Sequence, residues 1–151
     1  MKKSIIMNAI LMFILMFTLC ACGETNMIEK ISNNEITATG EFEERTILNA
    51  SRITVESEEF KELQNRVDLK QFDGVNLVIY DFSIEKEGKT FEPKKDVTIT
   101  LPRPFMSPNG FETYHIKSDN TIEKLETKVE GVNISFQQVL FQHLLLQVKI
   151  Q

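Results

Sequence analysis

The sequence is poor in the residues on which many ligand sites and small folds depend. Its 151 residues include no tryptophan, two tyrosines, two histidines and two cysteines. Because both cysteines, Cys20 and Cys22, lie near the N-terminus, the rest of the chain has neither a disulfide nor a thiol nucleophile. The chain must therefore be held together by a hydrophobic core, which a chain of this length can build.

Positive charge is also scarce. The chain has 17 Lys and Arg against 22 Asp and Glu, a net charge of −5, and losing Lys2 and Lys3 would leave −7. Binding to a nucleic-acid backbone requires clustered Lys and Arg side chains. We therefore expect no nucleic-acid partner.

Motifs for catalysis are missing or incomplete. Gly88-Lys89-Thr90 looks like the end of a phosphate loop, but Ser83 stands where that loop needs its first glycine. A Gly-x-Ser-x-Gly motif, which would carry a serine nucleophile, is absent. His115 and His143, with Asp81 or a glutamate, offer a metal site only if the fold brings them together. We expect a protein that is not an enzyme, without a cofactor or metal.

The N-terminus has the layout of a secretory leader. Two lysines precede an apolar run from Ile5 to Ala21, which ends in Leu19-Cys20-Ala21-Cys22-Gly23. This ending resembles a bacterial lipoprotein signal, in which a small residue precedes the cysteine to be modified. The resemblance implies a leader over 1–21, cleavage between Ala21 and Cys22, and a diacylglycerol thioether on Cys22.

The predicted lipid places the protein at the extracytoplasmic face of the cell membrane. A thiolate is the side-chain nucleophile suited to forming the thioether, and two or three acyl chains anchor stably where one alone is marginal. An uncleaved membrane helix is an alternative, but seventeen residues interrupted by Asn8 are short for a span. Ordinary cleavage with release is a further alternative.

The body of the chain predicts a mainly β fold. Residues 22–35 are polar and predict a lipidated N-terminus with a flexible tether, followed by one domain over 36–151. The spacing of Phe60, Leu63 and Val67 predicts one short helix over 58–67, with Ser57 as its N-cap. Alternating apolar residues predict strands over 36–42, 52–55, 75–84, 97–101, 113–116, 122–125, 132–136 and 144–150.

Between these strands stand turn residues, including Asn49-Ala50-Ser51, Asp73-Gly74 and Gly131. Many short strands at this spacing favour an antiparallel β-sandwich of the immunoglobulin-like type. In the strand over 97–101 the threonines are expected to point outward.

Part of this pattern also resembles a known module. The segments concerned are Tyr80-Asp81-Phe82-Ser83-Ile84, Val97-Thr98-Ile99-Thr100-Leu101-Pro102, Tyr114-His115-Ile116 and the closing strand that begins at His143-Leu144. Their order is similar to a small β-sandwich module of Gram-positive cell-surface proteins, over residues 51–150. Leu144-Leu145-Leu146-Gln147 stands where that module has Phe-Ser-x-Tyr. The resemblance implies a β-sandwich at a cell surface and no catalytic residues.

Two segments are candidates for binding a partner. Val139, Leu140 and Phe141, with the run that includes Leu145, are apolar on both faces. Such a run is either a strand buried on both sides or an exposed edge that docks a partner. Phe105, in the segment Arg103-Pro104-Phe105-Met106 of a proline-bounded loop, is a second candidate.

The favoured hypothesis is a non-catalytic envelope lipoprotein that binds a cell-envelope protein or another ligand. A solute- or wall-glycan-binding lipoprotein is the first alternative, although only Tyr80 and Tyr114 are left to form an aromatic platform. A metal-dependent envelope enzyme is the second alternative.

Overall fold

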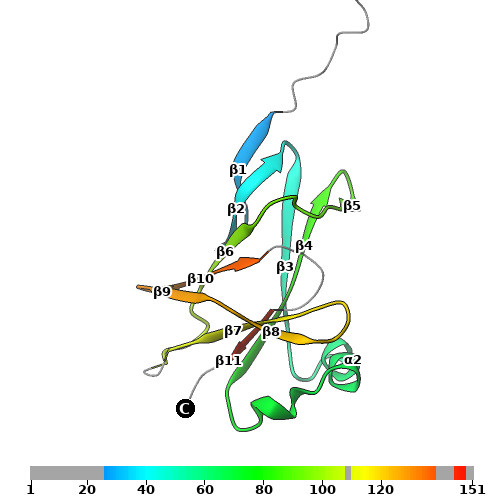
Figure 1. Cartoon of the computed structure of the whole chain (residues 1–151), viewed down its shortest axis with the longest axis vertical. Helices are drawn as coiled ribbons and strands as arrows, with labels where there is room; N and C mark the ends of the chain where they lie inside the picture. The colour runs from blue at the N-terminus through cyan, green and yellow to red at the C-terminus, as the bar shows by residue number, and fades with distance from the viewer. Residues whose placement is uncertain (1–25, 108–109, 139–144, 149–151) are drawn as a thin grey trace, which may run out of the picture.

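A computed structural model describes residues 26–107, 110–138 and 145–148, which form two antiparallel sheets facing each other (Figure 1). Sheet A has the strand order β1 (Met27–Asn33), β2 (Ile36–Glu43), β6 (Val97–Pro102), β10 (Asn133–Gln138), β9 (Thr127–Glu130). Sheet B has the order β3 (Thr46–Ile53), β4 (Leu77–Lys86), β11 (Leu145–Val148), β7 (Glu112–Ile116), β8 (Ile122–Leu125), and β5 (Lys89–Thr90) pairs with β4. The predicted antiparallel β-sandwich is confirmed.

The space between the sheets is filled by alternate side chains of the strands. In β6, Val97, Ile99 and Leu101 are buried, whereas Thr98 and Thr100 are half-buried on the outer face, as predicted. This core consists of Ile31, Ala38, Phe42, Leu48, Phe82, Ile84, Val97, Ile99, Leu101 and Phe136. Burying each large apolar side chain contributes about 1.5–3 kcal/mol, so the core is the main term that offsets chain entropy.

A second core lies on the other face of sheet B, under α2 (Glu58–Arg66) and the 3₁₀ helix η2 (Leu69–Phe72). The predicted helix and its N-cap are confirmed, because the Ser57 hydroxyl accepts a hydrogen bond of 3.1 Å from the Phe60 N–H. This core consists of Phe60, Leu63, Val67, Leu69, Phe72, Ile79 and Ile116. Sheet B is therefore packed on both faces where α2 and η2 lie, whereas Ile47 and Asp81 on the same outer face are exposed.

The first strand was not predicted. Residues 27–33 lie in the segment that the sequence indicated as a tether, yet they form β1 and pair with β2. The alternation is hidden because the register shifts between Ile28 and Lys30, so the apolar residues do not follow a period of two. The pairing extends to Asn26, whose carbonyl accepts a 3.0 Å hydrogen bond from the Glu44 N–H.

Other boundaries also differ from those predicted. Asn49-Ala50-Ser51, expected to be a turn, lies inside β3, where Ala50 is registered opposite Phe82. The strand β9 was missed because Val129 is its one apolar residue. The last predicted strand, over 144–150, is found as β11 over the residues of it that the structure describes.

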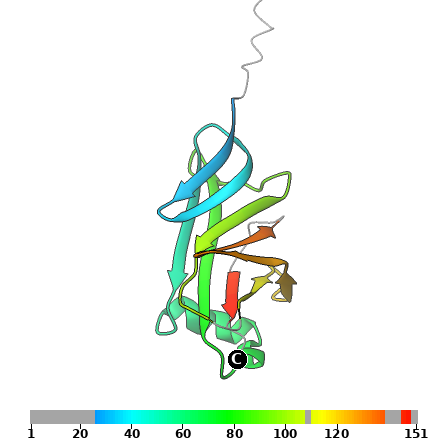
Figure 2. The same ribbon diagram turned by 90° about the vertical axis from the view of Figure 1, so that its left-hand side faces the viewer.

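Different elements lie at the two ends of the long axis of the molecule (Figures 1 and 2). The start of β1, the β2–β3 turn and the β4–β5 hairpin gather at one end, and α2 lies at the other. Within the described part of the chain, no helix is both long and apolar enough to cross a membrane.

The second core yields a direct test. Leu63→Ala removes a fully buried side chain from α2, and we expect it to lower the free energy of unfolding by about 2–5 kcal/mol. Gln64→Ala, on the exposed side of the same helix, should change it by less than about 0.5 kcal/mol. Urea unfolding followed by circular dichroism measures both, and equal effects would contradict the packing described.

Candidate functional site

The outer face of sheet A carries polar side chains in two rows that cross the strands. We call these outward side chains the sheet A face. The first row is Ser32, Thr37, Thr100, Ser135 and Lys128, and the second is Lys30, Thr39, Thr98 and Gln137. Neighbouring strands are about 4.8 Å apart, so each row places its hydroxyl and amide groups at regular intervals.

Charge is unevenly distributed over these two rows. On the central strands β2, β6 and β10 the six positions are uncharged, being threonine, serine or glutamine. The charged members, Lys30 and Lys128, lie on the outer strands β1 and β9. In a chain that is 26% charged, this arrangement gives the face a neutral centre and a charged margin.

The sheet A face is hollowed along β6, β10 and β9. The hollow has a volume of about 290 Å³ and is lined by Thr98, Glu126, Lys128, Glu130, Ser135, Phe136 and Gln137. Among the described residues, Glu126, Lys128 and Glu130 form no ion pair with one another or with other side chains. Hydroxyl and amide groups both donate and accept hydrogen bonds, so this hollow suits a polar ligand.

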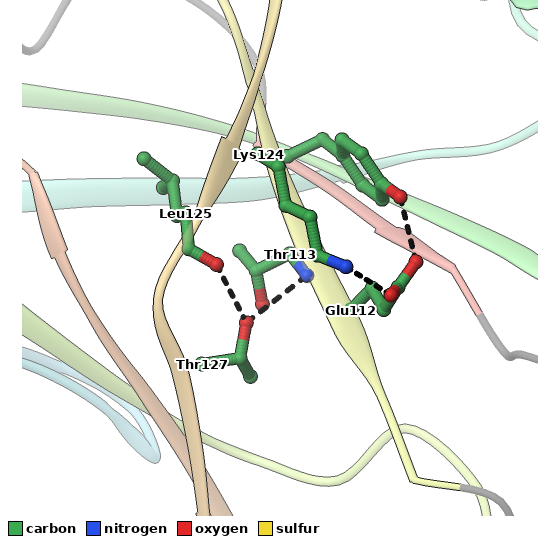
Figure 3. Close-up of polar contacts among 6 residues, drawn as sticks. Glu112, Thr113, Lys124, Leu125 and Thr127 are labelled. Atoms are coloured by element: carbon green, nitrogen blue, oxygen red, sulfur yellow. Dashed lines mark hydrogen bonds and ion pairs between the residues drawn. The ribbon is translucent and has the colours of Figure 1, made fainter.

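A second polar cluster lies on sheet B, where β7 and β8 pair (Figure 3). Glu112 forms an ion pair with Lys124, and its second carboxylate oxygen accepts a 2.6 Å hydrogen bond from the Tyr114 hydroxyl. The Tyr114 ring packs edge-on against Phe72 of η2, with ring centroids 5.1 Å apart. The cluster therefore joins two strands to the helical layer.

The environment of this cluster shifts two pKa values in opposite directions. The hydrogen bond from Lys124, followed by that from Tyr114, lowers the pKa of Glu112. Burial of the phenol, followed by its hydrogen bond to Glu112, raises the pKa of Tyr114 to about 12. Both shifts keep the pair in its hydrogen-bonded form at neutral pH, with Glu112 ionised and Tyr114 protonated.

One hydroxyl joins the two sheets at their edge. The Thr127 hydroxyl, at the start of β9, accepts a 3.1 Å hydrogen bond from the Thr113 N–H of β7 and donates at 3.2 Å to the Leu125 carbonyl (Figure 3). The Thr113 hydroxyl beside it is buried and has no hydrogen-bond partner among the side chains that the structure describes. This contact fixes where the chain passes from sheet B to sheet A.

Of the residues considered for a metal site, His115 and Asp81 lie on opposite faces of sheet B. His115 is buried on the inner face of sheet B, whereas Asp81 is exposed on the opposite face. His143 lies outside the described residues. No group of three His, Cys, Asp or Glu side chains within 26–107, 110–138 and 145–148 could hold an ion.

The predicted binding and lipidation residues fall in different places. Leu145 begins β11, whose backbone pairs with β4 on one side and β7 on the other, so this part of the apolar run is not an edge strand. Phe105 is half-buried and packs on Phe111, with ring centroids 5.2 Å apart, while the adjacent Met106 is 78% exposed. The remaining candidates, Ala21, Cys22, Val139, Leu140 and Phe141, lie outside the described residues.

The sheet A face was not singled out from the sequence. Its one local signal is the repeated threonine-apolar-threonine pattern in Thr37-Ala38-Thr39 and Thr98-Ile99-Thr100. These two segments are registered opposite each other although about 60 residues separate them. Spacing along the chain contains no information on that pairing.

Comparison with known proteins found no match: no family model matches the chain, and no curated protein or solved structure does.

The Glu112 cluster predicts a pH-dependent contribution to stability. Because the pKa of Glu112 is lowered by folding, its contribution is present above the ordinary value of 4.5 and is lost as the pH falls through the folded-state pKa. We expect Glu112→Gln to lower the free energy of unfolding by about 1 kcal/mol at pH 7 and by clearly less near pH 3. Urea unfolding at both pH values checks this, with Glu130→Gln as control. An effect of the same size at both pH values would contradict it.

Proposed function

We propose that the protein is a membrane-anchored extracytoplasmic lipoprotein whose β-sandwich is a non-catalytic binding module. The observation that carries the proposal is the sheet A face, with its neutral centre, charged margin and hollow of about 290 Å³. This face contacts a cell-envelope protein or another ligand.

The packing of the two sheets supports the choice of this face. Where α2 and η2 pack on the outer face of sheet B, they cover it and bury its apolar side chains. No described helix or strand covers the outer face of sheet A. Interfaces commonly combine a centre depleted of charge with a polar, accessible margin, and the two rows on this face have that distribution.

The evidence for the membrane anchor in this proposal is the sequence of the leader. The basic start, the apolar run and the ending Ala21-Cys22-Gly23 support acylation of Cys22 after cleavage. A lipid at that position holds the sandwich outside the cell, where partners in the envelope are within reach. The absence of thiols from residue 23 onward agrees with a domain that depends on its two cores.

A wall glycan is a second candidate for the ligand, favoured by the hydroxyl and amide groups of the sheet A face. Such groups match the donors and acceptors of a neutral sugar polymer. The two tyrosines do not contribute a platform, because Tyr80 stacks on Phe82 of the sandwich core and Tyr114 packs on Phe72. Recognition of a glycan would therefore rely on hydrogen bonds.

Cross-linking in intact native cells tests the sheet A face. Thr98→Lys combined with Ser135→Lys places two charges in its neutral centre, where a bound ligand would have to desolvate them. We expect capture of the main partner, protein or glycan, to fall by about tenfold, since each unpaired polar group buried by a ligand costs at least about 1 kcal/mol.

The matched control is Gln64→Lys combined with Asn65→Lys, which adds the same charge on the exposed side of α2. This variant should retain the partner. Equal capture by wild type and both variants would place the binding surface elsewhere.

The anchor has a separate test in the same cells. Replacing the acceptor thiol in Cys22→Ala should leave an unprocessed precursor and abolish labelling with a fatty-acid probe, because no other thiol has a small residue before it. Cys20→Ala should still be labelled and processed. Persistent labelling of Cys22→Ala would show that another residue is modified.

A further inference from the structure

We propose that the end of the sandwich nearest Cys22 rests on the phospholipid headgroups of the membrane that holds the anchor. We call this the tether end: the start of β1, the β2–β3 turn, the β4–β5 hairpin and the loop over 91–96. In this proposal Lys94 binds a lipid phosphate and Met27 contacts the boundary with the acyl chains. The proposal rests on the lipid anchor at Cys22 proposed above.

The length of chain before β1 limits how far the domain can stand from the membrane. Met27 is registered opposite Glu43, and the Asn26 carbonyl accepts a hydrogen bond from the Glu44 N–H, so the fold holds the chain from Asn26 onward. Four residue steps separate Cys22 from Asn26 and span at most about 14 Å when fully extended. The headgroup layer on one side of a bilayer is itself about 5–7 Å thick, so the tether end stays at the surface.

The arrangement of the fold determines which residues lie at this end. Figures 1 and 2 both show the start of β1 beside the β2–β3 turn and the β4–β5 hairpin, with α2 at the far end of the long axis. A hollow of about 250 Å³ lies at the tether end, lined by Met27, Glu41, Glu43, Phe91, Lys94 and Lys95. The hollow and the start of β1, which follows Cys22 closely in the sequence, therefore share one end of the molecule.

Ion pairs at the hollow leave one of its lysines available. Glu41 pairs with Lys95 at 2.6 Å, and Glu43 pairs with Lys86. Lys94 is exposed and forms no ion pair within the described part of the chain. Because both carboxylates are already paired, a phosphate entering the hollow meets one free ammonium group.

The apolar members of the hollow suit the same location. Met27 is 54% exposed, a large fraction for an apolar side chain at the start of a strand, and Phe91 is half-buried beside it. Apolar side chains next to lysines are the composition that binds at the interface of a bilayer. Glu44, Glu87 and Glu92 are also exposed at this end, so the contact depends on phosphate at close range rather than on a broad positive field.

Quenching of a fluorophore by labelled headgroups measures the contact directly. The full-length lipidated protein is reconstituted in vesicles of phosphatidylcholine and phosphatidylglycerol that carry a headgroup-attached quencher. A thiol-reactive fluorophore is placed by Thr90→Cys at the β4–β5 hairpin or by Gln64→Cys on α2, both exposed positions. We expect the Thr90→Cys probe to be quenched at least about twofold more strongly than the Gln64→Cys probe.

Substitution of the lysine tests its role. Lys94→Gln in the Thr90→Cys background should reduce the quenching by about half, because a positive side chain at the surface contributes to binding of anionic lipid. Lys70→Gln, an exposed lysine of η2 at the far end, is the control and should leave the quenching unchanged. If Lys94→Gln and Lys70→Gln behave alike, Lys94 is not the phosphate ligand.

Flotation of the vesicles separates failure of this proposal from failure of the anchor. Protein that floats with the vesicles but shows equal quenching at both probes has its anchor and does not rest on the headgroups, which overturns the docking proposal alone. Protein that does not float lacks the lipid, which overturns the anchor and the docking together. Flotation with quenching confined to the Thr90→Cys probe supports both.

Discussion

Sheet B has an apolar core on each of its faces, and this constraint limits which surfaces of the molecule are open. Sheet A packs against one of its faces, and α2 with η2 packs against the other. A sheet with two buried faces needs apolar side chains at successive positions, as Val78 and Ile79 of β4 illustrate. Sheet A has one apolar face and one polar face, so its outer side is left for solvent or a ligand.

Local patterns explain what the sequence could predict. Alternation was clear in β6, where Val97, Ile99 and Leu101 face one core, and the helix over 58–66 was clear from its apolar spacing and the Ser57 cap. These signals are local, and they were sufficient for the class of fold.

What the sequence did not predict depends on contacts distant along the chain. The strand β1 lacks clean alternation because of its register shift, and β3 continues through Asn49-Ala50-Ser51 because β4 pairs with it along its whole length. The sheet A face depends on the pairing of β2 with β6, which no local pattern specifies. The turn propensity of Asn and Ser was overridden by a long pairing partner.

The pairing of β1 with β2 also has a mechanical consequence. A pull between the proposed anchor at Cys22 and a ligand on the proposed binding face would enter the fold at Met27 and pass to β2 through six registered residue pairs. If the force runs along β1, these pairs are loaded together and slide in shear, instead of separating one after another. The first strand would then carry the force on the domain, and the neighbouring strands of sheet A would remain in register under tension.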